Sequence, residues 1–323
     1  MSGPIDEFLR ELDEQTHQSP ERRAILRGLV TRIVQLAQLE ADTSDLRIAS
    51  TALNELLEAS ALFAAWRDKA KVTVFGSART QPDDPLYEMA RAFGEATAAR
   101  GWMTVTGAGP GIMEASSKGS GKDNTLGVNI ELPFEQGANE FIDVDEMHVA
   151  MKFFFTRKVA MTRASHAFVA FPGGVGTMDE LFEILTLVHT GKTNPAPIVL
   201  VETPEGTFWE RWCHFVNVLV EDGYIDEVDT CLFRVCTSVS SAIDEIEHFY
   251  ANYRSLVVEP TRARMQLHRV PDENQRRELA SRFPAFTFAQ GFQVEGDALS
   301  FDFDGRNYVR LRLLIDEVNR LVP

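Results

Sequence analysis

The 323-residue sequence has few cysteines, no long apolar run and little positive charge. Its three cysteines, Cys213, Cys231 and Cys236, form no CxxC pair, so we expect reduced thiols and a cytoplasmic protein. No apolar stretch approaches the roughly 18 residues that a membrane-spanning helix needs. The acidic N-terminus does not resemble a secretory signal. The sequence therefore predicts no membrane partner.

The charge balance is strongly acidic. The net charge is −16, and residues 201–250 hold 11 Asp and Glu against two Arg. A surface of this kind repels nucleic acid, and no basic stripe offsets it, so we expect no nucleic-acid partner. A small anionic ligand can still bind such a protein through backbone N–H groups at helix N-termini.

The signatures of several cofactor-dependent classes are missing. No G-K-[ST] phosphate loop occurs, and Ile112 stands where the dinucleotide fingerprint G-x-G-x-x-G requires its last glycine. These gaps argue against a P-loop ATPase and an NAD-dependent oxidoreductase. No lysine lies in a recognisable pyridoxal-phosphate context, and His148, His166 and His189 lack the spacing of metal ligands. The sequence predicts no cofactor and no metal.

Three segments differ in their pattern. Residues 1–70 predict helices without strands. Residues 71–250 alternate short apolar strands with helices, which predicts a doubly wound α/β fold, a parallel sheet covered on both faces. Residues 251–323 break this alternation and predict a small C-terminal α/β extension. We therefore expect an N-terminal helical segment, an α/β core and an extension.

Local signals fix some of the expected element ends. Ser19 is the predicted N-cap of the first helix, with proline after it, and Thr43 or Ser44 is that of the second. Asp304-Gly305 predicts a hairpin turn in the extension. The amphipathic helices of the N-terminal segment offer more apolar surface than one sheet can cover, so we expect a homodimer or a larger homo-oligomer.

The glycine-rich places lie at the ends of expected strands. The expected strands are 71–78, 102–107, 125–130, 166–171, 196–202 and 231–236, and the helices between them are 85–101, 111–121, 149–165, 178–192 and 206–223. In such sheets ligands bind beyond the carboxyl ends of the strands. Three loops at these ends predict a phosphate-bearing ligand, and their candidate binding residues are Gly76, Ser77, Arg79, Gly107, Gly109, Gly111, Gly173, Gly174, Val175, Gly176 and Thr177.

Charged residues near the third loop allow two interpretations each. Arg157 and Lys158 interrupt an otherwise apolar helix, either as a solvated patch or as cations that bind the ligand. Thr177 and Glu180 have the spacing of a capping box, so Glu180 either caps the following helix or performs chemistry. The three phenylalanines 153–155 are expected in the core rather than as a stacking platform for a base.

A resemblance bears on these alternatives. Residues 172–180, PGGVGTMDE, fit the signature PGGxGTxxE, and the pair Arg157-Lys158 precedes them. Together with GSAR at 76–79 and GAGPGIME at 107–114, the sequence resembles the LONELY GUY (LOG) family, long mislabelled as lysine decarboxylases, over about residues 71–220. The resemblance implies a Rossmann-like oligomer that hydrolyses nucleoside 5′-monophosphates, AMP-like purine nucleotides favoured, to free base and ribose 5-phosphate.

The resemblance also implies roles for residues. Arg157 and Glu180 would be the catalytic pair, and the backbone of Gly173 to Thr177 would hold the 5′-phosphate. Cleavage of an N-glycosidic bond develops positive charge on the ribose, which a fixed carboxylate stabilises. The alternative is a non-catalytic nucleotide sensor or a molybdenum-cofactor carrier on the same fold. Binding a phosphate requires neither Arg157 nor Glu180, so we favour catalysis.

Overall fold

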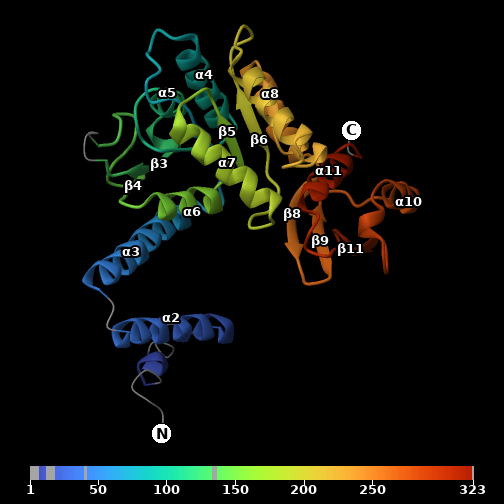
Figure 1. Ribbon diagram of the computed structural model, residues 1–323, viewed down its shortest axis with the longest axis horizontal. Coiled ribbons are helices and arrows are strands. Elements are labelled where there is room, and N and C mark those ends of the chain that lie inside the picture. Colours follow the sequence, from blue (N-terminus) through green and yellow to red (C-terminus); the bar gives the residue numbers. More distant parts are fainter. Residues whose placement is uncertain (1–6, 12–18, 40–41, 133–136, 322–323) are drawn as a thin grey trace. The chain divides into compact units, whose positions relative to one another are not determined.

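The computed structural model describes residues 7–11, 19–39, 42–132 and 137–321. The chain divides into two compact units, Met1–Leu56 and Leu57–Pro323, each of which is described by itself. Figure 1 gives the order of the elements along the chain. The division into segments 1–70, 71–250 and 251–323 stays a prediction.

Helices make up most of the described part of the first unit. Helix α2 (Pro20–Gln38) begins where the sequence predicts, because the Ser19 side chain accepts a hydrogen bond from the Arg22 backbone N–H. Helix α3 (Thr43–Ala65) begins in this unit, and its predicted cap is wrong. Asp42 Oδ1 accepts from the Ser44 N–H at 2.9 Å, so the acid before the predicted pair is the capping residue.

The second unit contains a seven-stranded parallel sheet, in the order β4-β3-β2-β1-β5-β6-β7. Every neighbouring pair of strands is parallel, which confirms the predicted doubly wound α/β fold. The strands are β1 (Lys71–Phe75), β2 (Met103–Thr106), β3 (Thr125–Ile130), β4 (His148–Met151), β5 (Ala167–Ala170), β6 (Ile198–Val201) and β7 (Arg234–Cys236).

Helices cover both faces of this sheet because its strands are apolar on both sides. Val72 and Val74 of β1 pack in one buried cluster, and Phe75 packs in another on the opposite face. The first cluster includes residues of α4 (Pro85–Ala99), α5 (Ile112–Ser120) and α9 (Val239–Phe249), and the second includes residues of α6 (Phe154–Ala164), α7 (Val175–His189) and α8 (Phe208–Glu221) (Figure 1).

Strand β4 corrects the prediction of one long helix over residues 149–165. Residues 148–151 pair with β3 instead, with Met151 opposite Ile130, and α6 begins only at Phe154. A short apolar run suits a strand and a buried helix equally well, so its periodicity cannot separate the two. Residues 148–151 form a strand because β3 offers them an edge with which to pair.

A second, antiparallel sheet follows, in the order β10-β11-β9-β8. The Asp304-Gly305 turn leads from β11 into α11 and is not a hairpin, so that prediction is wrong. Gly296, with φ +67°, lies instead in the hairpin turn between β10 and β11. The elements are β8 (Tyr253–Val258), β9 (Arg262–Leu267), α10 (Glu273–Arg282), β10 (Gln293–Glu295), β11 (Ala298–Asp302), α11 (Tyr308–Asn319) and the short 3₁₀ helices η1 (Lys122–Asn124), η2 (Glu227–Leu232) and η3 (Pro284–Phe286).

The strand order positions the glycine-rich loops. The chain leaves β1 in one direction toward β2, β3 and β4 and in the other toward β5, β6 and β7, so β1 and β5 flank the point where the order reverses. The Ser77 N–H donates to the Pro172 carbonyl at 3.2 Å, and the Ile112 N–H donates to the Ser77 carbonyl at 3.1 Å. These bonds tie together the loops that follow β1, β2 and β5.

Within the ranges given above, no helix is both long enough and apolar enough to span a membrane.

Candidate functional site

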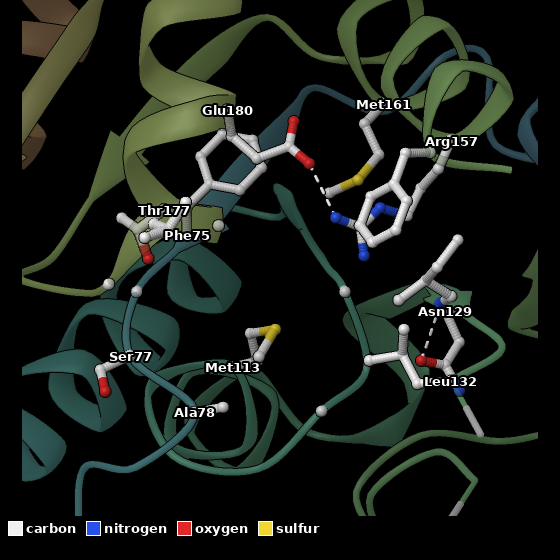
Figure 2. A pocket seen from close by; sticks show the side chains of 18 of the residues that line it. Phe75, Ser77, Ala78, Met113, Asn129, Leu132, Arg157, Met161, Thr177 and Glu180 are labelled. Atoms are coloured by element: carbon white, nitrogen blue, oxygen red, sulfur yellow. Dashed lines mark hydrogen bonds and ion pairs between the residues drawn. The ribbon is translucent and has the colours of Figure 1, made fainter. Parts of the chain in front are cut away.

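A cavity of about 700 Å³ lies at the switch point of the large sheet (Figure 2). This volume is within the range of small-molecule sites in proteins. Most of the residues predicted from the sequence line it: Gly76, Ser77, Arg79, Gly107, Gly109, Arg157, Gly174, Val175, Gly176, Thr177 and Glu180. Three predicted residues, Gly111, Gly173 and Lys158, are not in this lining.

Gly111 and Gly173 shape the loops around the cavity. Gly111 has φ +70°, a conformation that favours glycine, and a Cβ there would overlap the Ser77 carbonyl oxygen. A Cβ on Gly173 would overlap the Thr177 side chain. Both glycines therefore allow a close approach of two chain segments that any larger residue would prevent.

The N-terminus of α7 opens into the cavity. The helix begins at Val175, and its N-cap is Gly174, for which the described residues provide no side-chain capping bond. The first N–H groups of a helix have no intrahelical acceptor, so those of Val175, Gly176 and Thr177 are available to an anion. Gly174 and Gly176 carry no side chain that could cover this end of the helix. A Cβ added at either position would meet no atom within 4 Å, so the space beside both residues is open.

The start of α7 also decides the question of the capping box. Thr177 is the third residue of the helix and Glu180 the sixth, so neither stands at the N-cap. The capping interpretation of Glu180 is wrong, because the helix begins before the threonine rather than at it. Glu180 is instead directed toward Arg157 (Figure 2).

Arg157 and Glu180 form a buried ion pair at the cavity. Arg157 Nη2 donates to Glu180 Oε1 at 2.8 Å, with 13% and 6% of the two side chains exposed. The ring of Phe154 lies 5.2 Å from the guanidinium carbon, close enough for a cation–π contact. Among the described residues no acceptor reaches the buried Arg157 Nε. The pair thus leaves the guanidinium incompletely satisfied beside an open cavity.

The electrostatics of Glu180 reflect two opposing effects. Burial raises the pKa of its carboxyl above the usual range, and the charges of Arg157 and Lys158 offset part of that rise. Asp179, next to it on α7, adds to the rise in pKa through like-charge repulsion. A carboxylate tuned in this way is typical of functional sites.

Lys158 is directed away from the cavity. Its ammonium group pairs with Asp179 Oδ2 at 2.8 Å and with Glu183 Oε2 at 2.7 Å, and 8% of the residue is exposed. Burial by itself would lower the pKa of Lys158, but the hydrogen bonds to Asp179 and Glu183, together with the charges of Glu180 and Glu183, outweigh burial and raise it. Of these two consecutive residues, therefore, Arg157 lines the cavity and Lys158 does not.

Sequence reasoning missed the apolar walls of the cavity. Phe154 lines it and is half exposed, and Phe155 is also exposed, so the expectation that both lie in the core is wrong. Asn129 also lines the cavity. It is a polar residue near the carboxyl end of an apolar strand, a position that indicates a ligand site and could have been predicted from the sequence. The other residues that were not predicted are Phe75, Ala78, Met113, Ile130, Leu132 and Met161.

No metal centre is formed by the described residues, since no three His, Cys, Asp or Glu side chains converge there. The three histidines do not line the cavity. His166 Nδ1 accepts a hydrogen bond from the Lys71 N–H at 3.2 Å, and His189 Nδ1 lies 3.2 Å from Asp229. These two contacts are structural.

Comparison with known proteins assigns the family. Residues 99–246 match the family described as "Possible lysine decarboxylase". A cytokinin riboside 5′-monophosphate phosphoribohydrolase of Mycobacterium tuberculosis is 33% identical over 49% of this chain and 83% of its own length. One of Mycobacterium marinum is 31% identical over 46% of this chain and 78% of its own length. The molybdenum cofactor carrier protein of Chlamydomonas reinhardtii has 22% identity, with a TM-score of 0.41 over 55% of this chain and 96% of that one, a likeness of fold alone. The signature motifs and the two mycobacterial relatives show that the chain belongs to the LONELY GUY (LOG) family.

Proposed function

We propose that the protein is an enzyme that hydrolyses the N-glycosidic bond of nucleoside 5′-monophosphates, AMP-like purine nucleotides favoured, to free base and ribose 5-phosphate. One observation carries the proposal: the open N-terminus of α7 and the Arg157–Glu180 pair face the same cavity. The names of the two mycobacterial relatives, each a phosphoribohydrolase of a riboside 5′-monophosphate, support the same reaction class.

The phosphate would bind at the start of α7. The backbone N–H groups of Val175, Gly176 and Thr177 offer hydrogen bonds, and the helix dipole favours a negative charge at this end. Arg79 lies at the cavity with an exposed side chain and supplies a nearby cation. These groups can bind an anion even though the chain as a whole has a net charge of −16.

The ribose would lie between the phosphate site and Glu180. Glu180 follows the N-cap Gly174 by six residues, which corresponds to about 9 Å along the helix at 1.5 Å per residue. This separation leaves room for a sugar whose 5′-phosphate contacts the end of the helix and whose anomeric carbon faces the carboxylate. Hydroxyl groups of the ribose could then accept hydrogen bonds from Arg157, which lines the cavity.

The proposed cleavage depends on the positive charge that develops on the ribose. As the bond from C1′ to the base nitrogen breaks, its electron pair leaves with the base and positive charge develops on the ribose. The Glu180 carboxylate stabilises that charge and orients the water that attacks C1′. The water loses a proton on attack, and the departing base takes one up. Arg157 opposes the effect of burial on the Glu180 pKa and so favours the ionised carboxylate that this role requires.

The base would occupy the apolar part of the cavity. Met113, Leu132 and Met161 line it, and methionine side chains adapt to flat aromatic surfaces. The half-exposed ring of Phe154 lies at the same cavity and can stack on a base. These walls fit a purine ring system and supply little hydrogen bonding, so we expect several purine monophosphates to be accepted.

A direct test incubates the protein with AMP, GMP, IMP, CMP, UMP and a cytokinin riboside 5′-monophosphate. Free base is separated by chromatography, and ribose 5-phosphate is measured in the same samples. We expect the two products in equal amounts, with AMP among the best substrates. Binding without release of base from any of these nucleotides would refute hydrolysis and favour the non-catalytic alternative.

A further inference from the structure

We propose that Lys158 is a positioning residue: it clamps α6 to α7 so that Arg157 meets Glu180, and it neutralises the acids that flank Glu180. The inference rests on the proposed function, because it assigns Lys158 a role in that same site. It replaces the role in ligand binding that the sequence predicts for this residue.

Three ion pairs, made by two adjacent residues of α6, join α6 to α7. Arg157 and Lys158 are consecutive residues of α6, and each pairs with acids of α7. Arg157 Nη2 reaches Glu180 at 2.8 Å, while Lys158 Nζ reaches Asp179 at 2.8 Å and Glu183 at 2.7 Å. The two acids that Lys158 bridges are four residues apart and so lie on one face of α7. This bridge limits rotation and sliding of α7 relative to Arg157.

The contacts of Lys158 with Asp179 and Glu183 differ from a surface salt bridge because the lysine side chain is buried. Only 10% of the Lys158 side chain is exposed, against 52% for Asp179 and 32% for Glu183. Lys158 Nζ also lies 3.4 Å from the Asp179 backbone carbonyl oxygen, so it contacts the main chain of α7 next to Glu180. An ammonium group held by three acceptors has little freedom to reach a ligand in the cavity, which it does not line.

The charge of Lys158 also acts on Glu180. The charged groups near Glu180 are Arg157 and Lys158 from α6 and Asp179 and Glu183 from its own helix. Without Lys158, two carboxylates would stand uncompensated next to a buried third. The like charges would then favour the protonated form of Glu180, which cannot stabilise a ribosyl cation.

The test measures the pKa of Glu180 without relying on activity. Protein labelled with ¹³C at glutamate carboxyls is titrated by NMR, and the Glu180 signal is the one missing in Glu180→Gln. We expect the pKa to rise by about one pH unit or more in Lys158→Met and to change much less in Lys158→Arg, which keeps the charge. Arg163→Met, an exposed cation in the last turn of the same helix, is the matched control and should leave the Glu180 pKa unchanged.

Kinetics give the second readout. Lys158→Met should lower kcat about tenfold or more with little change in KM, because positioning is lost while the phosphate contacts remain. A raised KM with unchanged kcat would make Lys158 a substrate contact and overturn the inference, as would an unchanged Glu180 titration. If circular dichroism shows that Lys158→Met does not fold, Lys158→Gln, which keeps a hydrogen-bond donor without the charge, takes its place in both measurements, and an unchanged Glu180 pKa in that variant refutes the role. A wild-type protein that releases no base refutes the proposed function alone, because the titration still tests the clamp.

Discussion

Replacing Glu180 with Gln removes one negative charge from the cavity and keeps the shape of the side chain. Glu180 is 4% exposed and its side chain accepts a hydrogen bond from Arg157, so the change is confined to this pair and to whatever binds beside it. Because Glu180 caps no helix, the substitution leaves the start of α7 intact. The variant therefore separates the electrostatic role of the residue from its structural one.

The expected loss of stability is small. The Gln oxygen can still accept from Arg157 Nη2, so a charge-assisted hydrogen bond becomes one with a neutral acceptor. Such bonds differ by about 1 kcal/mol in their net contribution. Removing the carboxylate also removes the cost of burying its charge but leaves the Arg157 guanidinium without a counter-charge, so these two effects on stability oppose each other. We expect the free energy of unfolding to change by about 1 kcal/mol or less.

The expected loss of activity is larger. Removing one group that opposes charge in a transition state typically lowers turnover by about a hundredfold or more, equivalent to about 2.7 kcal/mol. Nucleotide binding should persist, because the phosphate contacts come from the backbone of α7. A thermal melt, a binding titration and a base-release assay on the same preparation measure the three effects. Glu210→Gln, the same change on the exposed face of α8, is the control.

One result would refute this reasoning. If Glu180→Gln remains folded at the assay temperature and releases base as fast as the wild type, the carboxylate does not stabilise the transition state. If the variant loses binding and turnover together, the charge acts on the ground state rather than on catalysis.

Four further predictions address the cavity and the assembly. Because burial raises the pKa of Glu180, kcat/KM should fall as the pH drops through a value above the ordinary glutamate range, and a profile of kcat/KM against pH checks this. Adenosine should be hydrolysed at least about a hundredfold more slowly than AMP, since losing two or more charged hydrogen bonds costs about 3 kcal/mol; equal rates would contradict a phosphate site at α7. Gly176→Ala should melt no earlier than the wild type but raise KM, because the added Cβ meets no protein atom and narrows the anion site, whereas Gly173→Ala should melt earlier because its Cβ overlaps Thr177. Light scattering should give a mass of at least twice the 36.2 kDa monomer, and a monomeric mass at micromolar concentration would contradict the predicted homo-oligomer.

The fold and most of the cavity lining could be predicted from local patterns. Strands buried on both faces read as continuous apolar runs, so the alternation in residues 71–250 predicts a covered parallel sheet. Glycines at the strand ends mark where the chain turns closely around a ligand site, which places the loops of Gly76, Gly107 and Gly174 at one cavity. The signature around Glu180, with the pair at 157–158, identified the family. These features depend on neighbours in the sequence, and the sequence determined them by itself.

Only the tertiary structure decided how α6 and α7 meet. Consecutive residues of a helix point about 100° apart, so Arg157 and Lys158 cannot both face the cavity. The sequence does not say which of them does, because that depends on the rotation of α6 against α7. The same packing exposes Phe154 at the cavity instead of burying it, and the pairing of residues 148–151 with β3 delays the start of α6. Each outcome follows from contacts between segments far apart in the chain, for which local periodicity carries no information.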